Sequence, residues 1–383
     1  MPTAVVEIKP GILEWMSRQY EFNNLDMNWQ KRLNEWLSGS RKPTFAQLQE
    51  ICKKLHIPVG YLFLDAPPNE KLDILEYRTI KSEGLVEASN NLQDIVMEME
   101  MIQDWMKQYM LENDYGPFPY GTKKMDKDEI VKALYADAGI SVQWFESCAD
   151  TREAFAYFRT LFSNLGITIM MNGVVGNNTH RKLSIDEFRA FTLFDDYAPL
   201  IFINGADSYN GRLFSLLHEV AHVWCGKDNL FNDVPGRGRG VSALERVCNA
   251  VAAEILVPNS MFKQVWKRNY IDGDHLNSTI GDTAKVFRCG PMVITRRAYD
   301  NHFITRAIYL KMVKILCDSF KMKQNQSGGG NYYSTVQTRI DHRFFRCLVS
   351  SVQRGTTPYT TAFRLTHTNR STYDGLINRI AVF

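Results

Sequence analysis

Two histidines, His218 and His222, stand four residues apart in the sequence His-Glu-Val-Ala-His, which is an HExxH motif. The run from Arg212 to Cys225 is largely apolar and lacks proline and glycine, so it predicts a helix. Positions i and i+4 share one helix face, so both imidazoles would point at one spot. Neutral imidazoles bind Zn²⁺ well, and Glu219 could take a proton from metal-bound water. A pair of buried histidines without metal is the alternative, but the motif favours zinc.

A catalytic zinc site needs a third protein ligand and an open position for water. Two glutamates in the next predicted helix, Ala243–Leu256, could supply that ligand: Glu245 and Glu254. They are nine residues apart and therefore lie on nearly the same face. Glu245 is in the first turn, where the helix dipole stabilises a negative charge, whereas Glu254 is near the end. This position favours Glu245, although an ordinary charge at a helix N-terminus would look the same.

These segments resemble the ImmA/IrrE family of metallopeptidases. Residues Arg212–His222 match that family's pattern R-x-F-[ST]-L-[AL]-H-E-[LV]-[GA]-H, and Glu245–Pro258 match E-x-x-[AC]-N-x-[FV]-A-A-E-[LI]-L-[MV]-P. Cys248 stands where alanine is usual. The resemblance implies that the two histidines and Glu245 bind zinc and that Glu219 is the general base.

The resemblance extends beyond these motifs. Leu75–Arg78 is similar to an element that joins an N-terminal unit to the peptidase in longer members, and Gly328–Tyr333 is similar to an element near their end. The implied reaction is hydrolysis of a peptide bond: Glu219 takes a proton from water activated by zinc and passes it to the leaving amine. Side chains that could stabilise the oxyanion, although a structural role is favoured for each, are His180, Arg212, Tyr332 and Tyr333.

Substrate contacts are expected along a predicted strand just before the HExxH helix, Leu200–Asn204. If this strand were an edge, an extended peptide could pair with it. Phe202 and Asn204 are then candidate substrate-binding residues, together with Tyr332 and Tyr333. Residues 226–240, which are rich in glycine, asparagine and aspartate, predict a loop.

Composition limits the class of protein. At 383 residues the chain predicts two or three domains, and a net charge of +3 gives no global signature of nucleic-acid or membrane binding. The N-terminal residues do not form a signal peptide, and no apolar run is long enough to span a membrane. The seven cysteines are scattered and form no CxxC pair, which is typical of reduced thiols in the cytoplasm.

Hydrophobic periodicity predicts a mostly helical α+β fold, with a small twisted sheet packed on the HExxH helix and a helical unit before it. The resemblance implies that this helix is zincin-like. It also implies four parts, at residues 1–68, 69–127, 128–326 and 327–383: an Xre-like helical domain, a helical linker region, an ImmA/IrrE-like zinc metallopeptidase domain and a C-terminal helical segment.

The N-terminal unit resembles part of an Xre-type helix-turn-helix. Leu37–Leu48 is similar to its second half, but residues 20–36 are too few for a complete first half. Trp29, Leu33 and Trp36 indicate a packing helix, so a remnant used for dimerisation or partner docking is the alternative to DNA binding. Candidate DNA-contacting cations are Lys31, Arg32, Arg41 and Lys42.

The resemblance to these families implies three candidate functions. The first is a cytoplasmic zinc metallopeptidase that acts on one protein partner, a repressor or a toxin, by limited proteolysis. The second is a non-hydrolytic antitoxin or adaptor in which the same fold binds a partner toxin. The third is an autoregulator that binds DNA through residues 1–68. A homodimer is compatible with each of them.

Overall fold

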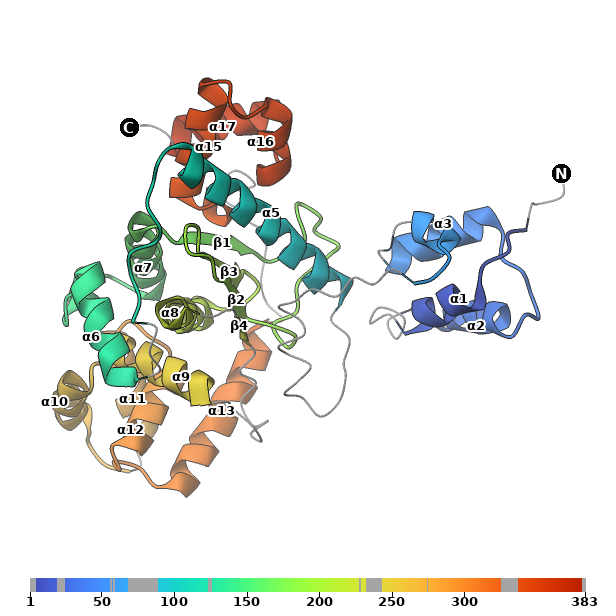
Figure 1. Cartoon of the computed structure of the whole chain (residues 1–383). Helices are drawn as coiled ribbons and strands as arrows, with labels where there is room; N and C mark the ends of the chain where they lie inside the picture. Colours follow the sequence, from blue (N-terminus) through green and yellow to red (C-terminus); the bar gives the residue numbers. More distant parts are fainter. Residues whose placement is uncertain are drawn as a thin grey trace. The chain divides into compact units, whose positions relative to one another are not determined.

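The computed structural model is dominated by helices (Figure 1). The described residues are 5–18, 25–55, 57, 59–67, 89–122, 126–226, 229–231, 243–273, 275–324 and 337–380. The chain separates into two compact units, Met1–Glu98 and Met99–Phe383, and helix α5 (Asn90–Glu112) spans the point of division. The finer division expected at residues 68, 127 and 326 stays a prediction. The segments Leu75–Arg78 and Gly328–Tyr333 lie outside the described residues.

The first unit is a small helical cluster. Its elements are α1 (Pro10–Ser17), α2 (Met27–Leu37), α3 (Phe45–Leu55) and the 3-10 helix η2 (Val59–Phe63). Asp26 caps α2 by accepting hydrogen bonds from backbone amides of its first turn. Trp29, Leu33 and Trp36 are buried on one side of α2, and the two indole rings meet edge to face. Helix α2 is therefore an amphipathic helix whose apolar side packs into this unit.

A four-stranded sheet with the order β1-β3-β2-β4 lies in the second unit. Strand β1 (Thr168–Asn172) is parallel to β3 (Leu200–Asn204), and β2 (Ala190–Leu193) is antiparallel to both β3 and β4 (Asn229–Phe231). Strand β3 is thus an interior strand, and the expectation that it is an edge for an extended substrate is wrong. The expectation of a loop throughout 226–240 is also wrong at β4, which forms through backbone pairing with β2, a partner too distant in sequence for a local pattern to reveal.

Helix α8 (Tyr209–Cys225) packs against β2 and β3 (Figure 1). Its start is capped by Ser208, whose Oγ accepts a hydrogen bond from the backbone amide of Gly211 over 3.2 Å. Its end is set by Gly226 at φ 67°, in the left-handed region that residues with a Cβ rarely adopt. Nearly all of its C-terminal two-thirds is buried, so the HExxH segment lies in the protein interior.

The segment before helix α6 (Lys127–Ala138), expected to be a linker, packs along the C-terminal end of α8. The backbone amide of Thr122 donates to the carbonyl of Trp224 over 2.9 Å, and that of Phe118 donates to the carbonyl of Asp196 over 2.6 Å. The rings of Tyr120 and Trp224 stack with centroids 6.1 Å apart. This strap fixes the end of the helix two residues beyond His222.

The second unit also contains helices that precede and follow α8 in the chain. They are α6 (Lys127–Ala138), η3 (Trp144–Ser147), α7 (Thr151–Leu165), α9 (Ala243–Leu256), α10 (Asn259–Asn269), α11 (Leu276–Val286), α12 (Pro291–Asp300), α13 (Arg306–Gln324), α15 (His342–Gln353), α16 (Tyr359–Thr366) and α17 (Arg370–Ile380). The mostly helical α+β fold is therefore confirmed. Within the described part of the chain, no helix combines the length and apolar character needed to cross a membrane.

The C-terminal helices are anchored to the edge strand β1. Asp341 caps α15 by accepting a hydrogen bond from the amide of Phe344 over 2.9 Å, and its other oxygen accepts from the amide of Ile169 over 3.2 Å. The guanidinium of Arg159 on α7 donates to the carbonyls of Ile169 and Ile340. Backbone groups on the outer side of β1 are thus paired with this part of the chain.

Candidate metal centre

Helix α8 brings His218 and His222 to one point. Both residues are fully buried, and their Nε2 atoms lie 3.1 Å apart. One helical turn separates them, which places the rings one above the other on the same face. The sequence motif therefore has the three-dimensional arrangement that its spacing predicts.

Glu245 reaches the same point from helix α9, which packs against α8. Its carboxylate oxygens lie 3.2 Å from His218 Nε2 and 3.4 Å from His222 Nε2. Ligand atoms bound at 2.0–2.1 Å to a tetrahedral Zn²⁺ are about 3.3 Å from one another. The two nitrogens and the carboxylate are therefore spaced as zinc ligands, and together they form a group that could hold a metal ion.

Glu254, the other acidic side chain considered as a ligand, is engaged elsewhere. Its carboxylate pairs with Arg297 over 2.8 Å and Lys127 over 3.4 Å, and it accepts a hydrogen bond from the amide of Asn259 over 2.9 Å. Burial acts to raise the pKa of Glu254, but this hydrogen bond and the two cations outweigh it, so the pKa is lowered. Glu254 joins α6, α9 and α12 and takes no part in the cluster.

Asn249 orients the first histidine. His218 Nδ1 lies 3.1 Å from Asn249 Oδ1, so the ring donates its Nδ1 proton to the amide oxygen. That tautomer leaves the lone pair on Nε2, the atom that faces Glu245 and His222. The sequence motifs did not predict this role for Asn249, although the i, i+4 spacing of Glu245 and Asn249 places both on one face of α9.

Glu219 lies beside the cluster in a fully buried position. Its Oε2 accepts a hydrogen bond from the hydroxyl of Thr192 over 2.6 Å, while its Oε1 is buried and has no hydrogen-bond partner among the described residues. Burial raises the pKa of Glu219 well above its usual value; the Thr192 hydrogen bond lowers it and the charge of Glu245 raises it further. A buried carboxylate oxygen without a partner beside three metal-type ligands is what a general base needs.

A pair of thiols lies next to the cluster, one turn further along each helix. Cys225 and Cys248 are buried, and a hydrogen bond that the Cys248 thiol donates to Cys225, together with burial, raises the pKa of Cys248. Neither thiol belongs to the group of closely spaced ligand atoms among the described residues, so the donor set is two imidazoles and one carboxylate.

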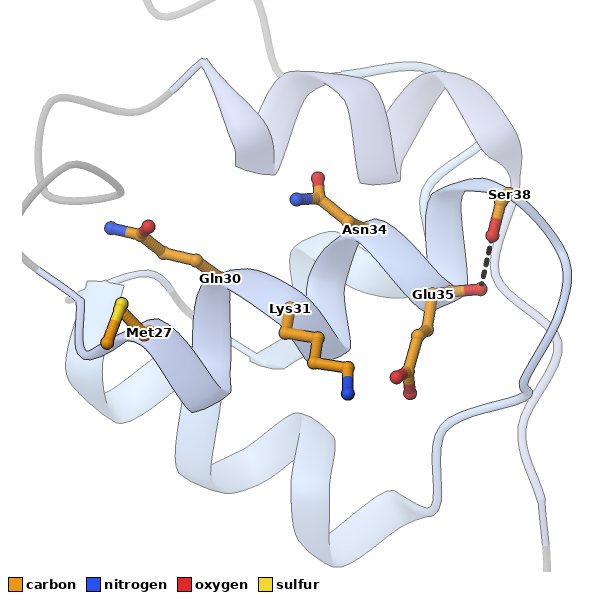
Figure 2. A pocket seen from close by; sticks show the side chains of 6 residues that line it. All are labelled: Met27, Gln30, Lys31, Asn34, Glu35 and Ser38. Atoms are coloured by element: carbon orange, nitrogen blue, oxygen red, sulfur yellow. Dashed lines mark hydrogen bonds between the residues drawn. The ribbon is translucent and has the colours of Figure 1, made fainter.

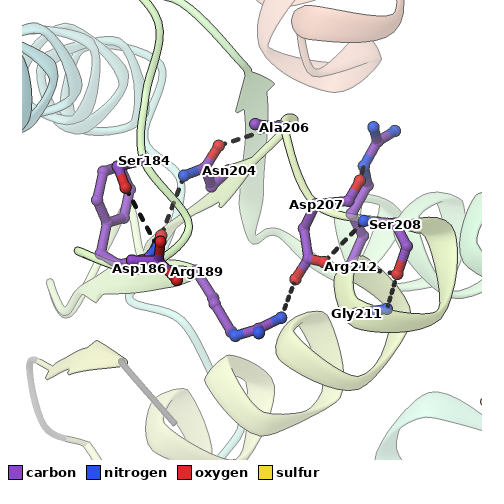
Figure 3. Close-up of polar contacts among 10 residues, drawn as sticks. Ser184, Asp186, Arg189, Asn204, Ala206, Asp207, Ser208, Gly211 and Arg212 are labelled. Carbon is purple, nitrogen blue, oxygen red and sulfur yellow. Dashed lines mark hydrogen bonds and ion pairs between the residues drawn. The ribbon is translucent and has the colours of Figure 1, made fainter. Parts of the chain in front are cut away.

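The junction between β3 and α8 is held by a buried ionic network (Figure 3). Asp207 pairs with Arg189 over 2.5 Å and accepts a hydrogen bond from the amide of Ser208 over 2.7 Å. Arg212 donates its Nε proton to the Asp207 carbonyl over 2.7 Å and lies over the ring of Tyr209. Arg212, a candidate for oxyanion stabilisation, thus anchors the start of α8.

Two of the predicted substrate-binding residues belong to the interior of the sheet. Phe202 and Asn204 are buried in β3, and the Asn204 amide donates to the carbonyl of Phe188 over 3.0 Å. His180 lies exposed in the loop between β1 and β2. Tyr332 and Tyr333 lie outside the described residues.

The predicted DNA-contacting cations belong to the first unit. Lys31 lines a pocket on the polar face of α2 (Figure 2), and the guanidinium of Arg32 lies 4.9 Å from the ring centre of Trp29. Arg41 lies 3.8 Å from Glu35, and Lys42 pairs with Glu7. Three of the four cations therefore have intramolecular partners. DNA binding by this unit stays a prediction.

The pocket on the polar face of α2 is lined by Met27, Gln30, Lys31, Asn34, Glu35 and Ser38.

Comparison with known families places the cluster in a recognised segment. Residues 163–299 match the family described as the IrrE N-terminal-like domain (Peptidase_M78), and this range contains His218, Glu219, His222 and Glu245. The match supports the resemblance to ImmA/IrrE metallopeptidases for this segment. Residues 340–379 match a domain of unknown function (DUF8813). The chain has no significant match among curated proteins or solved structures. Neither family covers residues 1–68, so their Xre-like character stays a prediction.

Proposed function

We propose that this chain is a zinc-dependent metallopeptidase that acts on a specific protein partner by limited proteolysis. The observation that carries the proposal is the convergence of His218, His222 and Glu245 at zinc-ligand spacing beside the buried carboxylate of Glu219. The match of residues 163–299 to the IrrE N-terminal-like domain supports the same class of function.

The residues of the site divide into holding and proton-transfer roles. His218, His222 and Glu245 would hold the ion, and Asn249 keeps the first imidazole in the tautomer that presents Nε2. Zinc, when bound, would polarise a substrate carbonyl and make water more acidic. Glu219 would accept a proton at Oε1 from the attacking water and deliver it to the leaving amine, because Thr192 already occupies Oε2.

The orientation of a substrate would come from a different strand than expected. Strand β4 ends the described sheet on the side opposite β1 and contacts α8, so an extended peptide that paired with β4 would run beside the HExxH helix. Pairing of this kind would favour cleavage of an exposed loop or terminus in one partner, a repressor or a toxin, over general protein digestion.

The experiment compares the wild-type chain with Glu219→Gln. Both proteins are purified, zinc is quantified by mass spectrometry, and each is incubated with an extract of cells that naturally express the chain, after which new protein N-termini are identified. We expect one zinc per chain in both proteins, and new N-termini from one protein only with the wild type.

Two results would overturn the proposal. The first is a chain that holds no zinc as purified and takes up none. The second is a Glu219→Gln variant with full biological activity, which would establish instead the non-hydrolytic role as an antitoxin or adaptor.

A further inference from the structure

The C-terminal helices α15–α17 carry an excess of positive charge that comes from arginine alone. Residues 340–379 contain six arginines, no lysine, two aspartates and no glutamate, which gives a formal charge of +4. The whole chain has a net charge of +3, so the remainder is slightly acidic. Residues 5–67, where DNA contacts were expected, contain eight basic and seven acidic residues. Of these two regions, only α15–α17 carries a strong excess of positive charge.

Most of these arginines face solvent. Arg343 donates to the carbonyl of Gly166 over 2.9 Å and serves packing. Arg354 is exposed and bonds to Asn113. The remaining four arginines are also exposed: Arg346, Arg364, Arg370 and Arg379.

The two acidic residues do little to neutralise this charge. Asp341 is 1 % exposed and committed to the cap of α15 and to β1. Asp374 makes only a long contact of 3.9 Å with Arg370. Within residues 340–379, the exposed guanidinium groups are therefore accompanied by a single exposed carboxylate, that of Asp374.

Two further features accompany the charge. Tyr359, at the start of α16, is 54 % exposed and offers an aromatic face to solvent. The loop 173–183 contains no acidic residue, carries Arg181 and Lys182, and is joined to this region through Asn177, which donates a hydrogen bond to the carbonyl of His367. The basic surface formed by α15–α17 therefore continues onto this loop.

We propose that α15–α17 and the loop 173–183 form a binding surface for single-stranded nucleic acid. Guanidinium groups bind phosphates through paired donors, and arginine rather than lysine supplies all the cations of these helices. An exposed tyrosine among such cations offers a stacking platform for a base, which an acidic protein segment would not need. The arginines are spread over three short helices, and none of these is a long basic helix of the kind that enters a DNA major groove.

The experiment measures binding of fluorescein-labelled dT20 and of a 20-base-pair duplex to the full chain by fluorescence anisotropy, at salt concentrations from 50 to 200 mM. The variant Arg346→Gln/Arg364→Gln/Arg370→Gln removes three exposed charges. The matched control, Lys31→Gln/Arg32→Gln/Lys42→Gln, removes three charges from the first unit. Tyr359→Ala tests stacking, and polyglutamate of equal charge serves as a competitor.

We expect dT20 to bind the wild type more tightly than the duplex does. The three-arginine variant should bind dT20 about tenfold more weakly or worse, and its salt slope should fall by about 2, because each phosphate contact in a single strand contributes about 0.7. Tyr359→Ala should weaken binding about fivefold or more with an unchanged slope, since stacking involves no counterion release. The control variant should bind like the wild type.

Several outcomes would overturn the proposal. They are the absence of dT20 binding at 100 mM salt, equal losses in the control variant, tighter binding of the duplex, and equal competition by polyglutamate, which would identify an acidic protein partner instead. Circular dichroism verifies that the variants are folded, and Tyr359→Ala keeps the test decisive if the three-arginine variant is not.

Discussion

The hydroxyl of Thr192 on β2 donates a hydrogen bond to Oε2 of Glu219 on α8 over 2.6 Å. Both residues are fully buried, so no water replaces this contact if it is lost. The hydroxyl also lies 3.3 Å from the Glu219 backbone carbonyl, and the shorter distance shows that its proton is directed to the carboxylate. The sheet thereby fixes which oxygen of Glu219 is available for proton transfer.

Replacing Thr192 by valine should destabilise the protein. Valine has nearly the same shape but cannot donate, so a buried carboxylate oxygen would lose its partner at a cost of about 1–3 kcal/mol. Thr192→Ser keeps the donor and should cost clearly less. Urea denaturation followed by circular dichroism measures the free energy of unfolding of each. Equal losses in the two variants would show that the methyl group, and not the hydrogen bond, matters.

Substitution of the two glutamates on α9 should have different effects on the zinc content of the protein. Glu245→Gln weakens a donor that lies 3.2 and 3.4 Å from the histidines, so we expect the zinc content of the purified protein to fall well below one per chain. Glu254→Gln alters a contact with Arg297 and should keep the zinc. Elemental mass spectrometry at pH 7 decides; zinc lost from Glu254→Gln alone would mean that the ligand is wrongly assigned.

Removing the metal should also lower thermal stability. An ion that binds the folded state and not the unfolded state adds a free energy of RT ln(1 + [L]/Kd), which is about 4 kcal/mol at a thousandfold excess over Kd. We therefore expect a chelator to lower the melting temperature of the wild type and added zinc to restore it. His222→Ala should melt at the same temperature with and without chelator. A chelator shift of equal size in that variant would place the stabilising metal elsewhere.

The ion pair of Glu254 should make stability depend on acid pH. Because its pKa is lowered in the folded chain, its contribution is present above the pKa of the unfolded state and is lost as the pH falls through the folded pKa. Glu254→Gln should therefore flatten the loss of stability below about pH 5 and reduce stability at pH 7. Urea midpoints measured from pH 3 to pH 7 provide the test. An unchanged acid slope in the variant would show that other carboxylates cause it.

Local signals predicted the elements that carry the cluster. Strand β3 and helix α9 have the bounds expected from the sequence, Leu200–Asn204 and Ala243–Leu256, because Pro199 precedes the first and Pro258 follows the second. The i, i+4 spacing of the histidines required only that a helix form. These features depend on neighbours within a few residues, which is the range over which a sequence pattern is informative.

Contacts between residues far apart in the sequence could not be predicted, because local patterns extend over only a few residues. The partner of Glu219 is 27 positions away, and the cation that engages Glu254 is 43 positions away. Neither composition nor hydrophobic periodicity can predict these two contacts. Strand β3 lies inside the sheet because β1 and β2 pair with its two sides, so Phe202 and Asn204 do not stand on an edge where an extended peptide could pair.

Two glycines inside helices should respond with opposite signs to replacement by alanine. Helix propensity alone predicts that both Gly211→Ala and Gly281→Ala stabilise the protein by up to about 1 kcal/mol. An added Cβ at Gly281 meets no atom within 4 Å, so this gain should appear in full. At Gly211 the Cβ would overlap the carboxylate of Asp207, which cannot move without breaking its buried contact with Arg189 (Figure 3). We expect Gly211→Ala to cost about 1–3 kcal/mol in urea denaturation. A stabilised Gly211→Ala protein would show that the Asp207 carboxylate can be displaced at little cost, and that the junction of β3 with α8 does not depend on it.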